Sequence, residues 1–162
     1  MNDIFTINYE IIKSQKLNII YKDTKRPWGG FFVISEHNAQ DFSNIYFNGL
    51  NTEELKISGK LSPKILIIAP NKRLSWQYHH RRSEIWKVVN GEIKVVTSHD
   101  DIERKEEYLK DGDEIRLSKG ERHRIIGMDE YAVVAEIWIH TDKDNPSDEN
   151  DIVRVQDDFD RN

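Results

Sequence analysis

Four residues of metal-binding type lie on segments that resemble neighbouring β-strands: Gln77, His79, Glu84 and His123. Side chains alternate between the two faces of a strand, so Gln77 and His79 share one face of their segment. Glu84 begins the next predicted strand, and His123 begins a third. Two imidazoles, one carboxylate and one amide oxygen suit Zn²⁺, Mn²⁺, Fe²⁺, Co²⁺ or Ni²⁺ better than Ca²⁺. We expect one divalent metal ion, with Zn²⁺ first among these, and open positions for water or substrate.

The elements that position these ligands are predicted to be short strands joined by turns. Apolar or alternating runs beyond residue 60 predict strands at 64–69, 73–79, 84–89, 92–97, 115–117, 123–126 and 131–140. Asn90-Gly91 is a hairpin signal between two of them. Residues 100–110 mix both signs of charge, which predicts a solvated loop or an edge strand. This pattern is typical of an all-β antiparallel barrel or jelly roll with a pocket in its mouth.

The first 60 residues show a different pattern. Ile4, Ile7, Ile11 and Ile12 fit one stripe of a helix, while residues 17–21 and 31–35 favour strands. Residues 37–47 repeat apolar side chains at helical spacing, which predicts a short helix. We expect residues 1–60 to form an extension packed on the barrel, and residues 61–162 to form the barrel and its C-terminal tail, as one structural domain.

Composition and charge exclude several classes of protein. The formal net charge of the 162 residues is -5, which argues against nucleic-acid binding, and the acidic segment 142–160 would repel an anionic membrane. The sequence has no cysteine, so thiolate ligands and thiol catalysis are excluded. The longest apolar run, 65–70, is too short to span a bilayer, and the N-terminus lacks the pattern of a signal peptide. We therefore expect a cytoplasmic protein.

The ligand spacing resembles the two cupin motifs. A lone strand histidine is usually structural, but here the spacing Gln77-x-His79-x4-Glu84-x6-Gly91 is similar to Gly-x5-His-x-His-x3,4-Glu-x6-Gly, with Gln77 in place of the first histidine. The segment from Gly112 to Gly127, which contains His123, resembles the second motif. The resemblance implies a cupin-type double-stranded β-helix with a helical N-terminal extension. It also implies weaker metal binding than three histidines give, and a homodimer.

Three further segments resemble the type II mannose-6-phosphate isomerase domain. They are Arg-Pro-Trp-Gly at 26–29, Gln-Tyr-His-His-Arg-Arg-Ser-Glu-Ile-Trp at 77–86, and Asp-Ile-Val-Arg with Asp-Asp-Phe-Asp-Arg between 151 and 161. Small stand-alone relatives of this domain are often called sugar-phosphate isomerases, including phosphoheptose isomerases. The chain departs from the family pattern at Arg81 and Ile85, where histidine is common, and at Asp160, where glycine is.

The resemblance suggests roles for five more residues. Arg82 matches an active-site arginine and would stabilise negative charge or bind phosphate, since a guanidinium is a poor base. Glu136 matches a glutamate of the last barrel strand and is the candidate base, against the alternative of an outward surface carboxylate. Arg161, Arg26 and His80 are the candidate substrate-binding residues. Their alternatives are a solvated tail for Arg161 and a purely structural turn for Arg26.

We therefore expect a metal-dependent isomerase that interconverts an aldose phosphate and a ketose phosphate through an enediol, with a small sugar phosphate as its partner. A non-catalytic sugar or sugar-nucleotide sensor on the same barrel is the competing interpretation. A metal-dependent epimerase or lyase is a third. Fold alone does not separate these, because one barrel hosts many activities.

Overall fold

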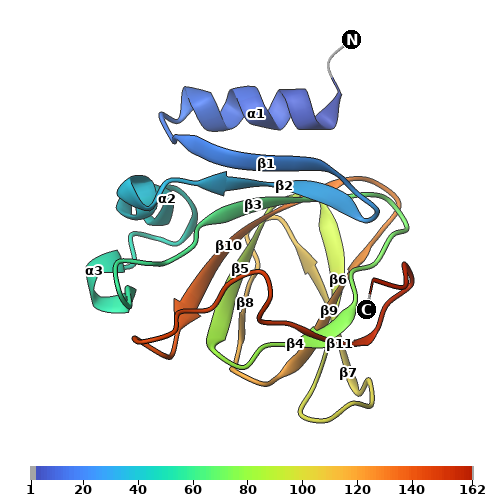
Figure 1. Cartoon of the computed structure of the whole chain (residues 1–162). Helices are drawn as coiled ribbons and strands as arrows, with labels where there is room; N and C mark the ends of the chain where they lie inside the picture. Colours follow the sequence, from blue (N-terminus) through green and yellow to red (C-terminus); the bar gives the residue numbers. More distant parts are fainter. Residues whose placement is uncertain (1–2, 162) are drawn as a thin grey trace.

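Two antiparallel sheets pack face to face in the computed structural model, which describes residues 3–161 (Figure 1). In spatial order, the first sheet contains β1 (Ile19–Arg26), β2 (Gly29–Ile34), β3 (Lys64–Ile68), β10 (Ala132–His140), β5 (Arg82–Asn90) and β8 (Glu114–Leu117). The second sheet contains β11 (Val153–Gln156), β4 (Trp76–Tyr78), β9 (Arg122–Gly127), β6 (Glu92–Ser98) and β7 (Lys105–Lys110). The prediction of an all-β jelly-roll barrel is confirmed.

Strand alternation divides the first sheet into an inner and an outer face. On β5, Trp86 and Val88 point into the barrel, where they pack with Leu66 of β3 and Val134 of β10. Ile85, the residue directly before Trp86, belongs to a second cluster on the outer face. The inward positions of the same strands are polar nearer the barrel mouth, and this change from apolar to polar places a site there.

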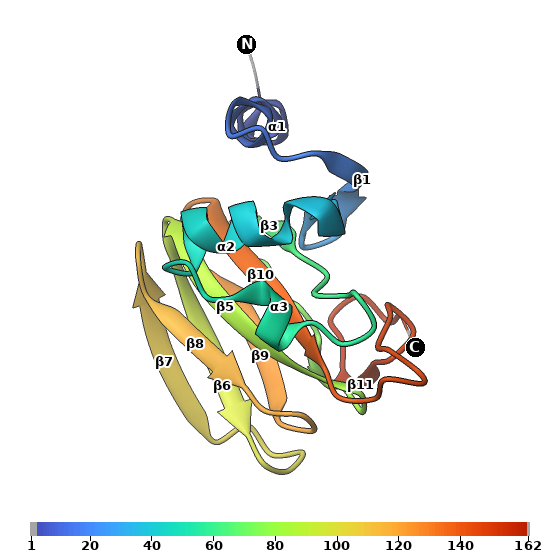
Figure 2. The same ribbon diagram turned by 90° about the vertical axis from the view of Figure 1, so that its left-hand side faces the viewer.

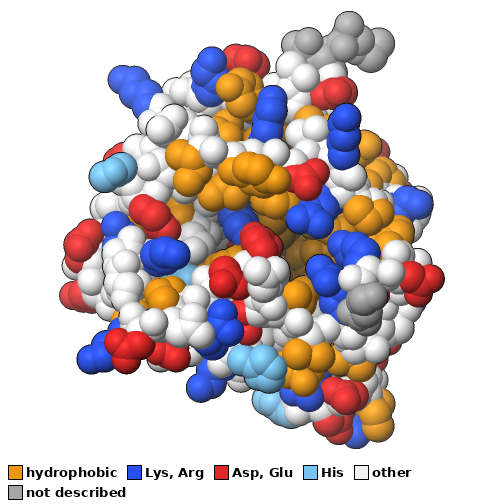
Figure 3. Space-filling model, viewed as in Figure 1, with side chains coloured by type: hydrophobic (Ala, Val, Ile, Leu, Met, Phe, Trp, Pro, Cys, Tyr) orange, Lys and Arg blue, Asp and Glu red, His pale blue; other side chains and the backbone are white. Residues whose placement is uncertain are grey.

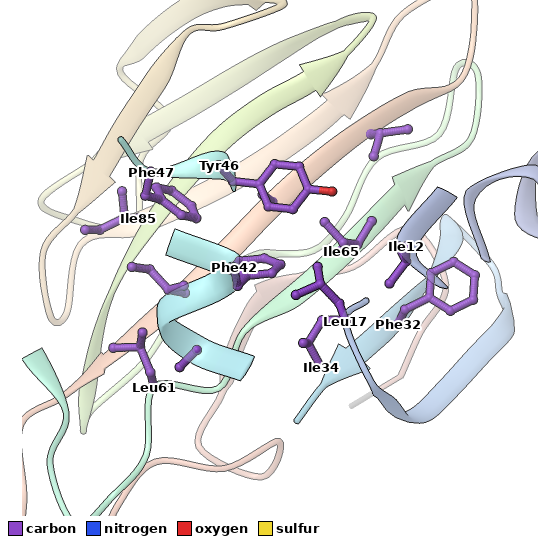
Figure 4. Close-up of a cluster of buried hydrophobic side chains, with 14 of the residues drawn as sticks. Ile12, Leu17, Phe32, Ile34, Phe42, Tyr46, Phe47, Leu61, Ile65 and Ile85 are labelled. Carbon is purple, nitrogen blue, oxygen red and sulfur yellow. The ribbon is translucent and has the colours of Figure 1, made fainter. Parts of the chain in front are cut away.

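Helices cover the outer face of the first sheet (Figure 2). They are α1 (Ile4–Ser14), α2 (Ala39–Tyr46) and α3 (Thr52–Leu55), with a 3-10 turn at Glu36–Asn38. Phe42 and Phe47 from the α2 region pack against the outward side chains Ile65 and Ile85, as Figure 4 shows. The N-terminal extension therefore contains strands as well as helices. β1 pairs with β2, and β2 pairs with β3 of the barrel.

Several sequence-based boundaries need correction. The strand expected at 73–79 is only Trp76–Tyr78. For the charged segment 100–110, the second of the two alternatives, an edge strand, is found over Lys105–Lys110 as β7. Ile7 and Ile11 of the predicted stripe are 44% and 46% exposed, because α1 presents Ile12 to the core and turns these two away. No helix within residues 3–161 has the length and apolar character needed to cross a membrane.

Candidate metal centre and its cavity

Three of the four predicted ligands converge inside the barrel near its mouth. Nε2 of His79, Nε2 of His123 and Oε2 of Glu84 form a triangle in which each pair of atoms is 3.2 Å apart. A divalent ion bonds such atoms at about 2.0–2.2 Å, so its ligands lie roughly 2.9–3.6 Å from one another. All three residues are buried. The His-Glu-His cluster (His79, Glu84, His123) therefore has the dimensions of a metal site.

Hydrogen bonds on the far side of each ring orient the two imidazoles. Nδ1 of His79 donates to the backbone carbonyl of Asp151 at 2.7 Å, and Nδ1 of His123 donates to that of Glu121 at 3.0 Å. A carbonyl oxygen can only accept, so the proton of each neutral ring is on Nδ1, and each Nε2 directs a lone pair at the cluster. Metal-bound histidines are commonly held in this way. Oε2 of Glu84 is buried without a hydrogen-bond partner, so three electron-rich atoms face one point that suits a cation.

The protonation states of the cluster also suit a metal ion. Burial alone would raise the pKa of Glu84, but the positive charge of the neighbouring Arg82 holds it well below its usual range. Burial lowers the pKa of His79, although Glu84 opposes that shift. The carboxylate is therefore charged and His79 is neutral at pH 7, which are the forms that bind metals.

Gln77 lies beside the cluster on the cavity wall. It is paired with His123 across β4 and β9, and its Nε2 donates to Oγ of Ser75 at 3.0 Å. This bond uses the amide nitrogen and leaves Oε1 as the atom able to act as a ligand. The structure thus places the predicted amide on the same wall as the cluster.

Arg82 points into the barrel and lies beside the cluster. Its guanidinium stacks 3.6 Å from the ring centre of Trp138, and Nη1 donates to Oγ of Ser147 at 2.8 Å. Nη2 lies 3.2 Å from Nε2 of His79, and Nε lies 3.8 Å from Oε1 of Glu84. These contacts fix a positive charge at the edge of the cluster.

Glu136 is inward-facing and buried, which removes the alternative of a surface carboxylate. Its Oε1 accepts a hydrogen bond of 3.0 Å from Nε1 of Trp86, the residue opposite it on β5. Burial and the neighbouring charge of Glu84 raise the pKa of Glu136 well above its usual value, although Lys64 opposes the shift. A carboxyl group of raised pKa inside a cavity is the kind of group that exchanges protons with a substrate.

The cluster opens into a cavity of about 100 Å³, bounded by both sheets and the C-terminal segment. Its wall carries five cationic side chains: Arg26, Lys64, Arg82, Arg154 and Arg161. Its carboxyl groups are those of Glu84, Glu136 and Glu149. Figure 3 shows the hollow on the face seen in Figure 1, with Lys and Arg side chains gathered around it. The cavity is thus cationic, although the chain as a whole carries a net charge of -5.

The predicted substrate-binding residues divide into two groups. Arg26 and Arg161 line the cavity. His80 is exposed and does not line it; its ring lies edge-on to Tyr78 at 5.4 Å. The reason is strand parity: His79 points inward, so its immediate neighbour points out.

Sequence reasoning missed three residues that the structure brings to this region. Arg154 and Lys64 line the cavity, and Asp151 supports the cluster. Arg154 and Asp151 belong to the quoted Asp-Ile-Val-Arg segment, which was the available signal. Lys64 begins a strand that is otherwise apolar. It lies two residues before Leu66, so strand alternation predicts that both side chains point into the barrel.

Two of the solved structures that resemble this chain have TM-scores above 0.5 and support the fold. The capsular polysaccharide assembling protein CapF from Staphylococcus aureus superposes with a TM-score of 0.57 at 15% identity, covering 86% of this chain and 32% of CapF. Drosophila melanogaster CENP-C, solved bound to CAL1, gives 0.52 at 17% identity, covering 76% of both chains. The DMSP lyase DddQ from Ruegeria pomeroyi gives 0.46 at 17% identity, covering 59% of this chain and 43% of DddQ. The chain therefore spans about a third of CapF and less than half of DddQ.

A search of curated proteins finds no match to the sequence. The family model described as mannose-6-phosphate isomerase C-terminal matches residues 35–157. This segment includes the whole His-Glu-His cluster, Arg82, Glu136 and Arg154, and it extends over most of the 162 residues. The chain belongs to the mannose-6-phosphate isomerase C-terminal family.

Proposed function

We propose that this protein is a metal-dependent sugar-phosphate isomerase that interconverts an aldose phosphate and its ketose through an enediol. Mannose 6-phosphate and heptose phosphates are the first substrates to test, in keeping with the family. The observation that carries the proposal is the presence, in one cavity, of the His-Glu-His cluster and the buried carboxyl of Glu136. Isomerisation needs an electrophile and a proton carrier close together, and these residues can provide both.

The charge of the cavity supports a phosphorylated substrate. Five cationic side chains face three carboxyl groups, of which Glu136 favours its neutral form because its pKa is raised. The buried Nε of Arg82 and Nε1 of Trp138 line the cavity without hydrogen-bond partners. Unpaired buried donors cost free energy, and a ligand rich in acceptor oxygens offsets that cost. A sugar phosphate is such a ligand.

The proposed reaction moves one proton between adjacent carbons. Glu136, in its ionised form, takes the proton from C2 of the aldose and returns it to C1, so the carboxyl group ends the cycle as it began. A second proton passes between the two neighbouring substrate oxygens. Arg82 stays protonated throughout and stabilises the negative charge that develops on those oxygens. A divalent ion held by His79, Glu84 and His123 would polarise the substrate carbonyl.

The test is exchange of substrate hydrogen with solvent. Metal-loaded protein is incubated in D₂O with a panel of aldose and ketose phosphates, and proton NMR follows both deuterium at C2 and the appearance of the isomer. Exchange or interconversion that disappears in His79→Ala supports the proposal. Binding of a panel member without either reaction would instead favour a sugar-binding sensor on the same barrel.

A further inference from the structure

Three arginines from both ends of the sequence line the cavity. Arg26 ends β1, Arg154 lies on β11, and Arg161 follows in the C-terminal segment. None of the three contributes to the His-Glu-His cluster, whose members come from β5, β9 and the segment after β4. The cavity therefore has a second cationic region that the proposed proton transfer does not use.

Neighbouring carboxylates hold two of these guanidinium groups in place. Asp157 accepts from Nε of Arg161 at 2.8 Å and from its Nη2 at 3.0 Å, so the planar group has a defined orientation. Nε of Arg26 lies 3.1 Å from Oδ2 of Asp23, as an ion pair without a hydrogen bond. Arg26 and Arg161 each retain further N–H donors after these contacts, because a guanidinium has five.

Arg154 shares the cavity wall with the other two arginines, and their positive charges act on it. Burial lowers its pKa first, and the positive charges of Arg161 and Arg26 lower it further, while Asp157 and Glu149 oppose the shift. Glu149 is already paired with Lys64. Gathering three guanidinium groups at a partly buried wall is unfavourable without a ligand, and an anion among them would relieve the repulsion.

We propose that Arg26, Arg154 and Arg161 form an oxyanion subsite that binds the phosphate group of the substrate. The inference rests on the proposed function for the rest of the substrate, because it places the phosphate at the β11 wall and the reacting carbons at the cluster. Guanidinium groups bind phosphate oxygens in pairs, which orients the group as well as attracting it. A neutral sugar would leave this subsite unused.

Inorganic phosphate tests the subsite without any isomerase chemistry. Chelator-treated, metal-free protein is titrated with phosphate by calorimetry at low ionic strength, where surface screening is weakest. We expect one phosphate per chain. Arg154→Gln should weaken binding by roughly tenfold or more, the effect of losing a charge-assisted pair of hydrogen bonds. Arg116→Gln is the matched control, because Arg116 is exposed on β8, outside the cavity, and pairs with Glu114.

Two further variants keep the test decisive if Arg154→Gln disturbs folding, which a thermal melt would reveal. Arg154→Lys keeps the charge and loses the planar fork, so it should bind with intermediate affinity. Arg161→Gln should also weaken binding. Equal phosphate affinity in the Arg154, Arg161 and Arg116 variants would overturn the subsite, as would loss of binding in His79→Ala, since phosphate would then bind at the cluster.

The subsite and the isomerase proposal fail separately. Phosphate binding that depends on Arg154, in a protein that turns over no sugar phosphate, supports the subsite and counts against the isomerase. Turnover with an unchanged KM in Arg154→Gln does the reverse.

Discussion

The backbone carbonyl of Asp151 accepts a 2.7 Å hydrogen bond from Nδ1 of His79, which ties the C-terminal segment to the candidate metal centre. The side chain of the same aspartate holds that carbonyl in place. Its two oxygens accept from the backbone N–H groups of His80 at 2.9 Å and Arg81 at 3.0 Å, and from Oγ of Ser147 at 2.5 Å. Asp151 therefore links the candidate metal ligand His79, the two residues that follow it (His80 and Arg81), and the C-terminal segment.

Asp151→Ala should weaken metal binding although Asp151 is not a ligand. Loss of the carboxylate leaves two backbone N–H groups unpaired and frees the carbonyl that orients His79. Removing such a support typically lowers metal affinity by about 10–100-fold. Unpaired donors also cost about 1–3 kcal/mol each in the free energy of unfolding.

The measurement is metal competition with a chelator of known affinity, beside denaturant unfolding. Asp148→Asn is the control, because its carboxylate is in the same segment but half exposed, 3.7 Å from Arg81. A variant that loses stability but keeps wild-type metal affinity would show that Asp151 acts only on the fold.

Removing both histidines of the cluster should abolish metal binding. Wild-type protein without a histidine tag is expected to hold about one transition-metal ion per chain, and His79→Ala with His123→Ala to hold none. Elemental analysis measures this directly. His99→Ala is the control, since His99 is exposed in the loop after β6. Full occupancy in the double variant would rule out the cluster as the metal site.

Strand parity explains why much of the site was predictable. Alternation puts Glu84 and Trp86 on one face of β5, and Glu136 and Trp138 on one face of β10, and the structure turns all four into the barrel. An alternating pattern needs only the local sequence, so the inward face follows once the strands are recognised. The same rule excludes His80, which the family resemblance had suggested.

Long-range pairing explains what the sequence could not reveal. Arg154 reaches the cavity because β11 pairs with β4, where Arg154 lies opposite Gln77. β11 is only four residues long and lies in an acidic tail, so its alternation of apolar and polar side chains is too short to predict a strand. The support of His79 by Asp151 likewise depends on where the tail folds back, which local propensity does not determine.

His140 should make the protein less stable in mild acid. Burial and the charge of Arg82 lower the pKa of His140 to about 4, and its Nδ1 accepts from the backbone N–H of Ser147 at 2.9 Å. The folded-state pKa lies below the unfolded value of about 6.5. The neutral ring therefore stabilises the fold above that pH, and this contribution is lost as pH falls from about 6.5 toward about 4.

Denaturant unfolding of wild type and His140→Asn between these pH values measures the effect. Asparagine keeps an acceptor for Ser147 and does not titrate, so its stability should fall less steeply with pH. If the free energy of unfolding falls with the same slope against pH in both proteins, His140 makes no contribution to the loss of stability in acid.

Asp160→Gly should keep the fold and improve phosphate binding. Asp160 has φ of 50°, a left-handed conformation that glycine adopts freely and aspartate tolerates. The substitution therefore adds no strain, and it removes a negative charge next to Arg161. An exposed charge of this kind is worth about 0.2–1 kcal/mol, so phosphate affinity should rise by roughly 1.4–5-fold. Calorimetry at two salt concentrations measures the gain, which should shrink at the higher one. Affinity that stays the same or falls would contradict it.

Glu136→Gln should abolish most turnover while making the metal-free protein more stable. The raised pKa of Glu136 means that the fold favours its protonated form. The free energy by which the protonated carboxyl stabilises the fold is fully present below the unfolded-state pKa. It is lost as pH rises through the folded-state pKa, so at neutral pH the carboxyl group lowers the stability of the fold. Glutamine is neutral, has nearly the same shape and can still accept from Nε1 of Trp86.

Two measurements on this variant separate a catalytic role from a structural one. Loss of a proton carrier typically lowers turnover by about 10²–10⁴-fold. Solvent deuterium exchange at C2 should fall with turnover, whereas metal content and phosphate affinity should stay at wild-type values. Unfolding of the metal-free variant should need more denaturant than wild type at pH 7 and above, with the difference shrinking in acid. Full turnover in this variant would place the base on another residue of the cavity, because no proton could then pass through position 136.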